Sequence, residues 1–294
     1  MRLGERRCAA ASLARNEPMA GTASTVRSWL LLEHDGPWGR DAFTDARLPD
    51  GFGAALSARC RASGVRPLLI RRPGGSGGSS TCFAIRSGPG SPWIERTELD
   101  RLEDALEIDL GALGRGEPLG MEPVGGAVLL VCTHGRHDPC CAERGRPLAL
   151  SLASTFPGET WETTHVGGDR FAGNLVAFPH GIYFGRVGPE DGGSVARAYL
   201  GGRVSLEYLR GRSCFPMAVQ AAEHALRSAR GLDRIDDVTV ERTSRTDVGL
   251  RVTFLVPGGR ATVHLAIEAA TPVFLTCHSA AEEAPPAYRV LSVE

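Results

Sequence analysis

The stretch Val128-Leu-Leu-Val-Cys-Thr-His-Gly-Arg-His-Asp-Pro-Cys-Cys-Ala-Glu-Arg-Gly145 puts chemically active side chains directly after an apolar run. Glycines precede the run and a polar loop follows it, which is typical of a buried strand. Cys132 is therefore expected at the point where a strand ends.

A second stretch of similar character begins at His165 and reads His-Val-Gly-Gly-Asp-Arg-Phe-Ala-Gly-Asn174. Its glycines allow a tight approach of the backbone. Two apolar segments follow it, on either side of Pro179-His-Gly181, which has the turn chemistry of a β-hairpin. We therefore expect the cysteine-rich and histidine-rich stretches to meet at one end of a sheet.

Together these two stretches resemble the sucrase/ferredoxin-like family, whose central part is a thioredoxin-like ferredoxin. The segments RCAAASLARNEPMAGTA at 7–23 and LGGRVSLEYLRGRSCFPMAVQAAEHAL at 200–226 also fit that family. The resemblance thus extends over most of the chain and is strongest in the two central stretches.

The resemblance implies a 2Fe-2S cluster held by a C-x8-C pair and, in the better-known eukaryotic members, by an H-x3-H pair. Carried over by position, these ligands are Cys132, Cys141 and His165, while the place of the second histidine is taken by Asp169. Carboxylate is a harder and rarer ligand for such a cluster than thiolate or imidazole. The fourth ligand is Asp169 itself or one of several other donors: Cys140, His134, His137, Cys8 or Cys277. It also stays open whether the chain binds a cluster at all.

The residues alone leave other roles open for these side chains. The spacing of Cys132 and Cys141 is compatible with an iron-sulfur cluster, a zinc site or two structural thiols. His165 could cap a turn, and Asp169 could pair with the neighbouring Arg170. His134 and His137 are expected outside the ligand set, and Cys140 is expected to tune or protect the cluster. Cys60, Cys82 and Cys214 are expected to be buried thiols, as is Cys8 if it is no ligand. Three arginines near these stretches could favour the reduced state of an anionic cluster, or could lie in solvent or in salt bridges: Arg136, Arg170 and Arg186.

The overall charge excludes several classes of function. The 294 residues include 33 basic and 34 acidic ones, for a formal net charge of -1. There is thus no bulk attraction to nucleic acid or to an anionic membrane. All basic residues are arginine, and a chain without lysine has neither Schiff-base chemistry nor a P-loop lysine.

The chain is expected to be cytoplasmic. No stretch approaches the roughly 20 apolar residues that cross a bilayer. The N-terminus, with Arg2, Glu5, Arg6 and Arg7, lacks a signal-peptide core. In a reducing compartment the eight cysteines are better explained as metal ligands, redox thiols or buried small residues than as disulfides.

The predicted fold class is α/β, with three parts. Residues 1–120 form an N-terminal α/β segment, residues 121–205 a thioredoxin-like ferredoxin domain, and residues 206–294 a C-terminal α+β segment. No internal repeat is visible, although two thioredoxin-like halves could be hidden by divergence. The first part is predicted to contain a parallel crossover unit, a flexible glycine-rich loop and an acidic helix: strand 28–33, helix 52–63, strands 66–71 and 81–86, loop 73–80 and helix 97–113.

The central part is predicted to follow the thioredoxin-like order of strand, loop, helix, strand, hairpin and helix. Such a fold presents its reactive loop at a helix N-terminus, where the helix dipole stabilises anionic sulfur. The tail is predicted to be a helix packed on a small antiparallel sheet. The predicted elements are strand 128–131, helix 148–154, strand 160–164, hairpin 175–187, helix 189–200, helix 218–228, and strands 237–242, 250–255, 261–267 and 273–277.

The function that these features favour is one-electron transfer by a soluble carrier between a reductase and an acceptor. No substrate pocket is then required, so a carrier is favoured over an enzyme. One alternative is a thiol oxidoreductase that uses Cys140 or Cys141 as nucleophile. Against this alternative, the chain lacks a C-x-x-C motif, and two adjacent cysteines have a poor geometry for a disulfide. The other alternative is a zinc-stabilised binding module.

Overall fold

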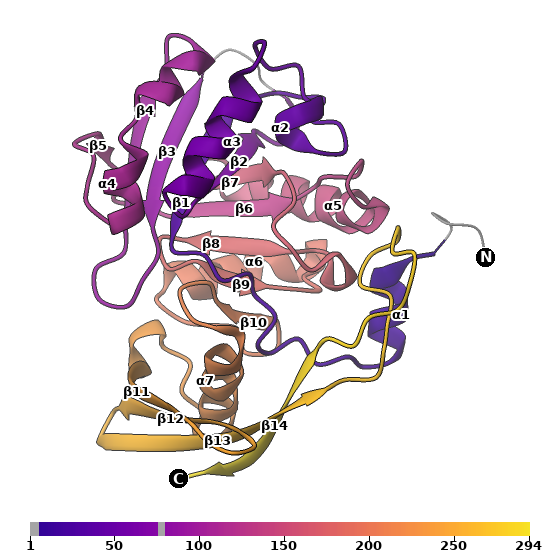
Figure 1. Cartoon of the computed structure of the whole chain (residues 1–294), viewed down its shortest axis with the longest axis vertical. Coiled ribbons are helices and arrows are strands. Elements are labelled where there is room, and N and C mark those ends of the chain that lie inside the picture. The colour runs from indigo at the N-terminus through magenta and orange to yellow at the C-terminus, as the bar shows by residue number, and fades with distance from the viewer. Residues whose placement is uncertain (1–5, 76–79) are drawn as a thin grey trace.

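The computed structural model describes residues 6–75 and 80–294. The first five residues of the N-terminal stretch and residues 76–79 of the glycine-rich loop 73–80 lie outside this part. The described residues form a mixed α/β fold with two sheets, a ten-stranded one and a four-stranded one (Figure 1). None of the helices in these residues has the length and apolar character that a membrane crossing requires.

The first half of the large sheet is built around two parallel strands joined by a helix. β1 pairs with β2 in parallel and with β3 in antiparallel, so the predicted crossover unit is confirmed. The burial of all six residues of β1 explains its continuous apolar run. The elements are β1 (Ser28–Glu33), α2 (Ala42–Asp45), α3 (Phe52–Ala62), β2 (Val65–Arg71), β3 (Thr81–Arg86), β4 (Trp93–Glu98), α4 (Leu110–Arg115) and β5 (Glu122–Pro123).

The predicted helix over 97–113 is wrong. The segment starts as the end of β4, which pairs with β3 over six positions, and continues as the 3-10 helix η1 (Leu102–Glu107) and then α4. The carboxylate of Asp104 accepts the backbone N–H of Arg101, and that of Asp109 accepts the N–H of Ala112. Each aspartate therefore caps a separate short turn instead of extending one helix.

The second half of the sheet has the predicted order of strand, helix, strand, hairpin and helix. Its elements are β6 (Val128–Cys132), α5 (Pro139–Thr155), β7 (Thr160–Thr163), β8 (Leu175–Phe178), β9 (Ile182–Phe184) and α6 (Pro189–Leu200). α5 begins well before the predicted start at residue 148. The Asp138 side chain caps it by accepting the N–H of Cys140, and Pro139 occupies the first helical position. Cys140 and Cys141 therefore lie in the first turn of a helix and not in a loop.

The two halves of the large sheet repeat one arrangement. The strand order is β4-β3-β1-β2 in the first half and β9-β8-β6-β7 in the second, with the same strand directions. They join where β2 and β7 run antiparallel over only two residue pairs, Ile70 with Thr163 and Arg71 with Glu162. Because these pairs lie at the carboxyl ends of both strands, the loops that follow β1 and β6 converge. The sheet continues across the predicted boundary near residue 120, and the three domain limits stay predictions.

The two halves also share one core. Trp29 of β1 packs edge-on against Phe178 of β8, with ring centroids 5.1 Å apart, and Phe83 of β3 packs against Trp161 of β7 at 5.6 Å. All four side chains belong to one buried cluster that spans both halves. Burial of aromatic surface therefore holds the sheet together across a junction that has few strand hydrogen bonds.

The C-terminal part is a helix on a four-stranded antiparallel sheet, as predicted. The predicted strand over 273–277 is wrong: Val273 makes only an isolated bridge to Glu283, while the Cys277 N–H donates to the Asp138 carboxylate. Figure 1 shows this segment running beside α1 before the chain returns to the sheet. The remaining elements are α1 (Cys8–Ala14), β10 (Leu209–Arg212), α7 (Met217–Arg230), β11 (Thr239–Arg245), β12 (Gly249–Val256), β13 (Gly259–Ala269) and β14 (Pro286–Val293).

A buried ion triad joins α7 to the large sheet. Glu223 is 2% exposed and lies between Arg212 of β10, at 2.9 Å, and Arg227, at 2.8 Å. Burial acts to raise the pKa of Glu223, but the two guanidinium groups outweigh it and hold this pKa below 4.5. The folded state therefore gains stability from the ionised carboxylate at pH values above the unfolded pKa, and loses it as the pH falls through the folded pKa.

We expect the substitution Glu223→Gln to lower the free energy of unfolding by roughly 3–5 kcal/mol near neutral pH, because it leaves two buried cations without a counter-charge. The difference from wild type should shrink as the pH falls below about 4.5. Denaturant unfolding at several pH values measures both effects. Glu241→Gln, which removes a carboxylate that pairs with Arg260 at the surface, is the matched control and should leave the midpoint unchanged. Equal effects of the two substitutions would contradict the role of the triad.

Candidate metal centre

The two cysteines of the C-x8-C pair come from facing ends of a strand and a helix. Cys132 is the last residue of β6, and Cys141 lies in the first turn of α5; they are 1% and 0% exposed. α5 approaches the strand so closely that a Cβ atom on Gly145 would lie 2.0 Å from the Cys132 carbonyl oxygen. Glycine at that position therefore allows the two thiols to meet.

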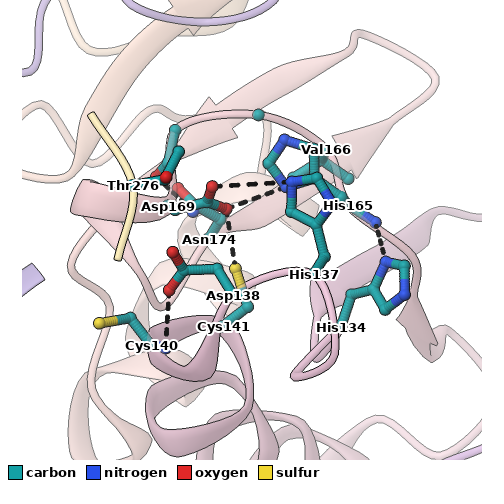
Figure 2. A network of polar contacts seen from close by, with 12 residues as sticks. His134, His137, Asp138, Cys140, Cys141, His165, Val166, Asp169, Asn174 and Thr276 are labelled. Carbon is teal, nitrogen blue, oxygen red and sulfur yellow. Dashed lines mark hydrogen bonds and ion pairs between the residues drawn. The ribbon is translucent and has the colours of Figure 1, made fainter. Parts of the chain in front are cut away.

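His165 and Asp169 come from the loop after β7. Gly167 and Gly168 have φ values of 101° and 82°, in the region that favours glycine, and they reverse the chain before η2 (Asp169–Phe171). The Asp169 carboxylate consequently faces back toward α5. Its Oδ1 atom lies 2.9 Å from His165 Nδ1 and 3.1 Å from Cys141 Sγ (Figure 2).

All four predicted ligands thus lie together in a buried space. The donor atoms of Cys132, Cys141 and His165 lie within 4.8 Å of one another, and Asp169 contacts the last two. His165 Nδ1 is buried, and its contact is the ion pair with Asp169 Oδ1 at 2.9 Å. Two thiols, an imidazole and a carboxylate form a donor set that suits iron or zinc.

The charges at the centre are coupled. Burial acts to lower the pKa of His165, but the Asp169 carboxylate and the Cys132 thiolate outweigh it and raise this pKa to about 9. The contact with the Cys141 thiol lowers the pKa of Cys132, in spite of burial and with support from His165. The same contact, together with burial, raises the pKa of Cys141.

The two histidines of the intervening loop have different tasks. His134 accepts the His165 backbone N–H at 3.2 Å and donates to the Gly39 carbonyl oxygen at 2.9 Å, so neither ring nitrogen is free. It supports the loop and connects it to the one after β1. His137 stacks on His165 with centroids 3.8 Å apart, and its Nε2 lies 3.8 Å from Asp169 Oδ2. Burial lowers the pKa of His137, so a neutral imidazole lies beside the predicted ligands.

A buried arginine that sequence reasoning missed holds the Gly167-Gly168 turn. Arg210 is 1% exposed; it donates to the carbonyl oxygens of Gly167 and Thr22 and, at 2.7 Å, to Asn174 Oδ1. Asn174 in turn donates to the Gly168 carbonyl oxygen. Burial lowers the pKa of Arg210 to about 10. An arginine in a strand is ordinarily assigned to the surface, so the sequence contains little sign that Arg210 is buried. The one available signal was its place within the short strand β10.

The arginines that the sequence suggested have other partners. Arg170 pairs with Glu17 at 2.6 Å and not with Asp169, so the predicted alternative of an Asp169–Arg170 pair is wrong. Arg186 donates to Ser12 and to the Glu17 carbonyl oxygen, near α1. Two of the three suggested arginines thus pair away from the centre, whereas Arg210 is a buried cation beside the loop that carries Asp169.

The other thiols named as possible ligands gather elsewhere. The Cys140 sulfur points away from Cys141 and lies 3.8 Å from Cys8 Sγ and 3.4 Å from Cys277 Sγ (Figure 2). Each of the eight cysteines of the chain is a buried free thiol. Cys140 therefore belongs to a second group of thiols and makes no contact with the predicted cluster ligands by its sulfur.

The model of the family described as Sucrase/ferredoxin-like matches residues 19–211, which is more than half of the chain. The chain belongs to the sucrase/ferredoxin-like family. The resemblance seen in the sequence is thereby confirmed, and the matched residues include all four predicted ligands.

Two curated relatives of this sucrase/ferredoxin-like chain are both named altered inheritance of mitochondria protein 32. The one from Meyerozyma guilliermondii is 36% identical over 74 residues, which are 22% of this chain and 26% of the relative. The one from Debaryomyces hansenii is 29% identical over 101 residues, which are 31% of this chain and 37% of the relative. The chain thus spans between a quarter and two fifths of these relatives.

Among solved structures, the chain is similar to two cysteine-to-serine variants of the thioredoxin-like 2Fe-2S ferredoxin from Aquifex aeolicus. Each is 20% identical and is aligned over 96% of its own length and 28% of this chain, with a TM-score of 0.24. A likeness at this level carries no argument about the sucrase/ferredoxin-like centre, which depends on the geometry given above.

We expect the substitution Gly168→Ala to lower stability more than Gly202→Ala does. Both glycines have positive φ, but a Cβ on Gly168 would lie 2.2 Å from an Arg210 nitrogen, whereas nothing lies near Gly202. Gly202→Ala therefore measures the backbone strain alone. The clash at Gly168 should add about 1–3 kcal/mol, because the buried guanidinium cannot withdraw. Denaturant unfolding of both variants measures the difference, and equal losses would show that the turn has room to adjust.

Proposed function

We propose that this protein binds a 2Fe-2S cluster through Cys132, Cys141, His165 and Asp169 and carries single electrons between a reductase and an acceptor. The observation that carries the proposal is the convergence of two thiols, an imidazole and a carboxylate in one buried place. Membership of the family supports it. When bound, a cluster of this kind takes up and releases one electron.

The arrangement of the elements supports a thioredoxin-like ferredoxin domain over residues 121–205. A thioredoxin-like unit needs two parallel strands connected by a helix, followed by a hairpin on the same sheet and a second helix. The segment from β6 to α6 provides these in that order. The first turn of α5 carries Cys141, and the partial positive charge at a helix N-terminus favours thiolate there.

The residues around the centre are suited to an anionic group. Cys132 and Cys141 would provide thiolates for one iron, and His165 with Asp169 would bind the other. Arg210 provides a buried positive charge, and its hydrogen-bond partners among the described residues are oxygen atoms of uncharged groups. Its charge would stabilise an added electron, which raises the reduction potential.

The histidine side of the centre is the side that a redox partner could approach. His137 and His165 line a cleft of about 420 Å³ whose other wall comes from the loop after β1, including Arg40 and Asp41. The side chain of His165 is 26% exposed, whereas both cysteines are buried. In the proposed function an acceptor or a reductase would contact this cleft and exchange the electron through the imidazole groups.

The thiol-oxidoreductase alternative has less support. A nucleophilic thiolate must be reached by its substrate. Cys140 and Cys141 are 1% and 0% exposed, and their sulfur atoms point to different groups of side chains. These two residues are therefore poor candidates for a nucleophile and for a reversible disulfide.

We expect anaerobically purified protein to contain about two irons and two acid-labile sulfides per chain, and the reduced protein to give an electron paramagnetic resonance signal. Cys132→Ser should lose iron and sulfide together. Cys60→Ser is the control, because Cys60 is equally buried but lies in the separate core of the first half. Wild-type protein without iron and sulfide would overturn the proposed function.

The fourth ligand is tested by comparing Asp169→Ala with His137→Ala. Both residues lie beside His165, and both have donor atoms near the centre. We expect Asp169→Ala to change the electron paramagnetic resonance signal or to lose the cluster, because imidazole and carboxylate ligands give iron different ligand fields. His137→Ala should leave the signal unchanged. The opposite pattern would assign the fourth position to His137.

A further inference from the structure

A second group of donor side chains is assembled from three distant parts of the chain. Cys8 comes from the start of α1, Asp138 and Cys140 from the start of α5, and Cys277 from the segment before β14. Their donor atoms lie within 4.8 Å of one another, and all four residues are buried. None of them belongs to the set proposed for the cluster. Three thiols from such distant positions do not meet by local chain geometry.

The spacing of the sulfur atoms fits a single metal ion. The three Sγ···Sγ distances are 3.8 Å for Cys8 and Cys140, 3.4 Å for Cys140 and Cys277, and 3.6 Å for Cys277 and Cys8. Thiolates bound to one tetrahedral zinc at about 2.3 Å are about 3.8 Å apart. All three distances are far beyond the roughly 2.05 Å of a disulfide. Sulfur ligands on different irons of a cluster would be farther apart than this.

The carboxylate of Asp138 is placed as a fourth donor. Its oxygen atoms lie 3.9 Å and 3.8 Å from Cys8 Sγ, close to the roughly 3.6 Å expected for oxygen and sulfur on one zinc. Asp138 is 0% exposed, and within residues 6–75 and 80–294 the contacts of its carboxylate are with backbone N–H groups and a thiol, not with a cation. A buried carboxylate without a cation is costly, and a divalent ion would supply the missing charge.

Hydrogen bonds from the backbone orient these donors. Asp138 Oδ1 accepts the Cys140 N–H at 2.9 Å, and Oδ2 accepts the Cys277 N–H at 2.7 Å. The Cys8 N–H points to Cys277 Sγ at 3.5 Å. Such contacts to ligand atoms are what fixes ligand direction in structural metal sites. The site is thus built by main-chain groups of all three segments.

We propose that Cys8, Cys140, Cys277 and Asp138 bind one zinc ion, separate from the 2Fe-2S centre. Four protein donors give a closed, tetrahedral site of the structural type. Binding would release the three thiol protons to solvent, leaving three thiolates on the ion. The ion would fasten the N-terminal helix and the segment before β14 to the start of α5, next to Cys141. It would thereby stiffen the helix turn that carries a proposed cluster ligand.

The direct test is metal analysis of anaerobically purified chain that has been supplied with zinc and then freed of loosely bound ions. We expect about one zinc per chain in wild type, and its loss in Cys8→Ser and in Cys277→Ser. Cys214→Ser is the matched control, because Cys214 is also a buried thiol but lies in the C-terminal core. Cys132→Ser should also keep the zinc.

Three outcomes would overturn the proposal. They are a wild-type chain that binds no zinc, zinc that is lost in Cys132→Ser but kept in Cys8→Ser, and zinc that is kept in both Cys8→Ser and Cys277→Ser. Iron and sulfide are measured on the same samples, so a missing cluster and a missing zinc ion are told apart.

A measurement on wild type alone covers the case in which the variants fail to fold. The zinc-loaded protein is treated with an alkylating reagent before and after a chelator, and the modified cysteines are found by peptide mass spectrometry. We expect chelation to increase the labelling of Cys8, Cys140 and Cys277, with Cys60 and Cys82 unchanged. Equal labelling of the three thiols before and after chelation would contradict the zinc site.

Discussion

The hydrogen bond from the Cys140 backbone N–H to the Asp138 carboxylate determines where α5 begins. That start places both Cys140 and Cys141 in the first helical turn, where neighbouring positions are about 100° apart around the axis. The two adjacent sulfur atoms therefore point to different sides, one toward Cys132 and Asp169 and the other toward Cys8 and Cys277. A start one residue later would rotate both thiols away from their partners.

Burial gives this arrangement its chemical character. The thiols of the candidate metal centre lie at the end of a strand inside the shared core, where water cannot screen their charge. The counter-charge comes from Arg210, which is held by uncharged oxygen atoms, and from the N-terminus of α5. The protein thus surrounds anionic donors with fixed positive groups and not with solvent, an environment in which the proposed uptake of an electron would require little rearrangement.

Local patterns were enough to predict most strands and helices of the large sheet. The strand that ends at Cys132, the crossover between β1 and β2, and the hairpin of β8 and β9 follow from apolar runs and turn residues. The convergence of Cys132, Cys141, His165 and Asp169 was likewise expected from their places at element ends. Their roles as ligands were implied by family resemblance, since spacing alone left several kinds of site open.

What the sequence did not show depends on contacts between distant segments. Nothing near Cys277 indicates that its N–H would leave strand pairing for the Asp138 carboxylate, so the segment was assigned to a strand. Arg210 has a polar side chain that is ordinarily exposed, and only the three-dimensional fold places Gly167 and Asn174 around it. The repeated strand order was not visible in the sequence, because the two halves have the same order and directions of strands but different side chains along them.

The repeated strand order gives the two halves of the large sheet different contributions to the candidate metal centre. At the place in the first half that corresponds to Cys132, β1 ends with Glu33, and α3 begins with Phe52 where α5 brings thiols. The first half thus repeats the strand arrangement without thiols at these two positions, and its loop supplies Gly39 to His134 and one wall of the cleft. A substitution on this wall of the cleft can therefore change the surface beside the centre while the donor set in the other half stays untouched.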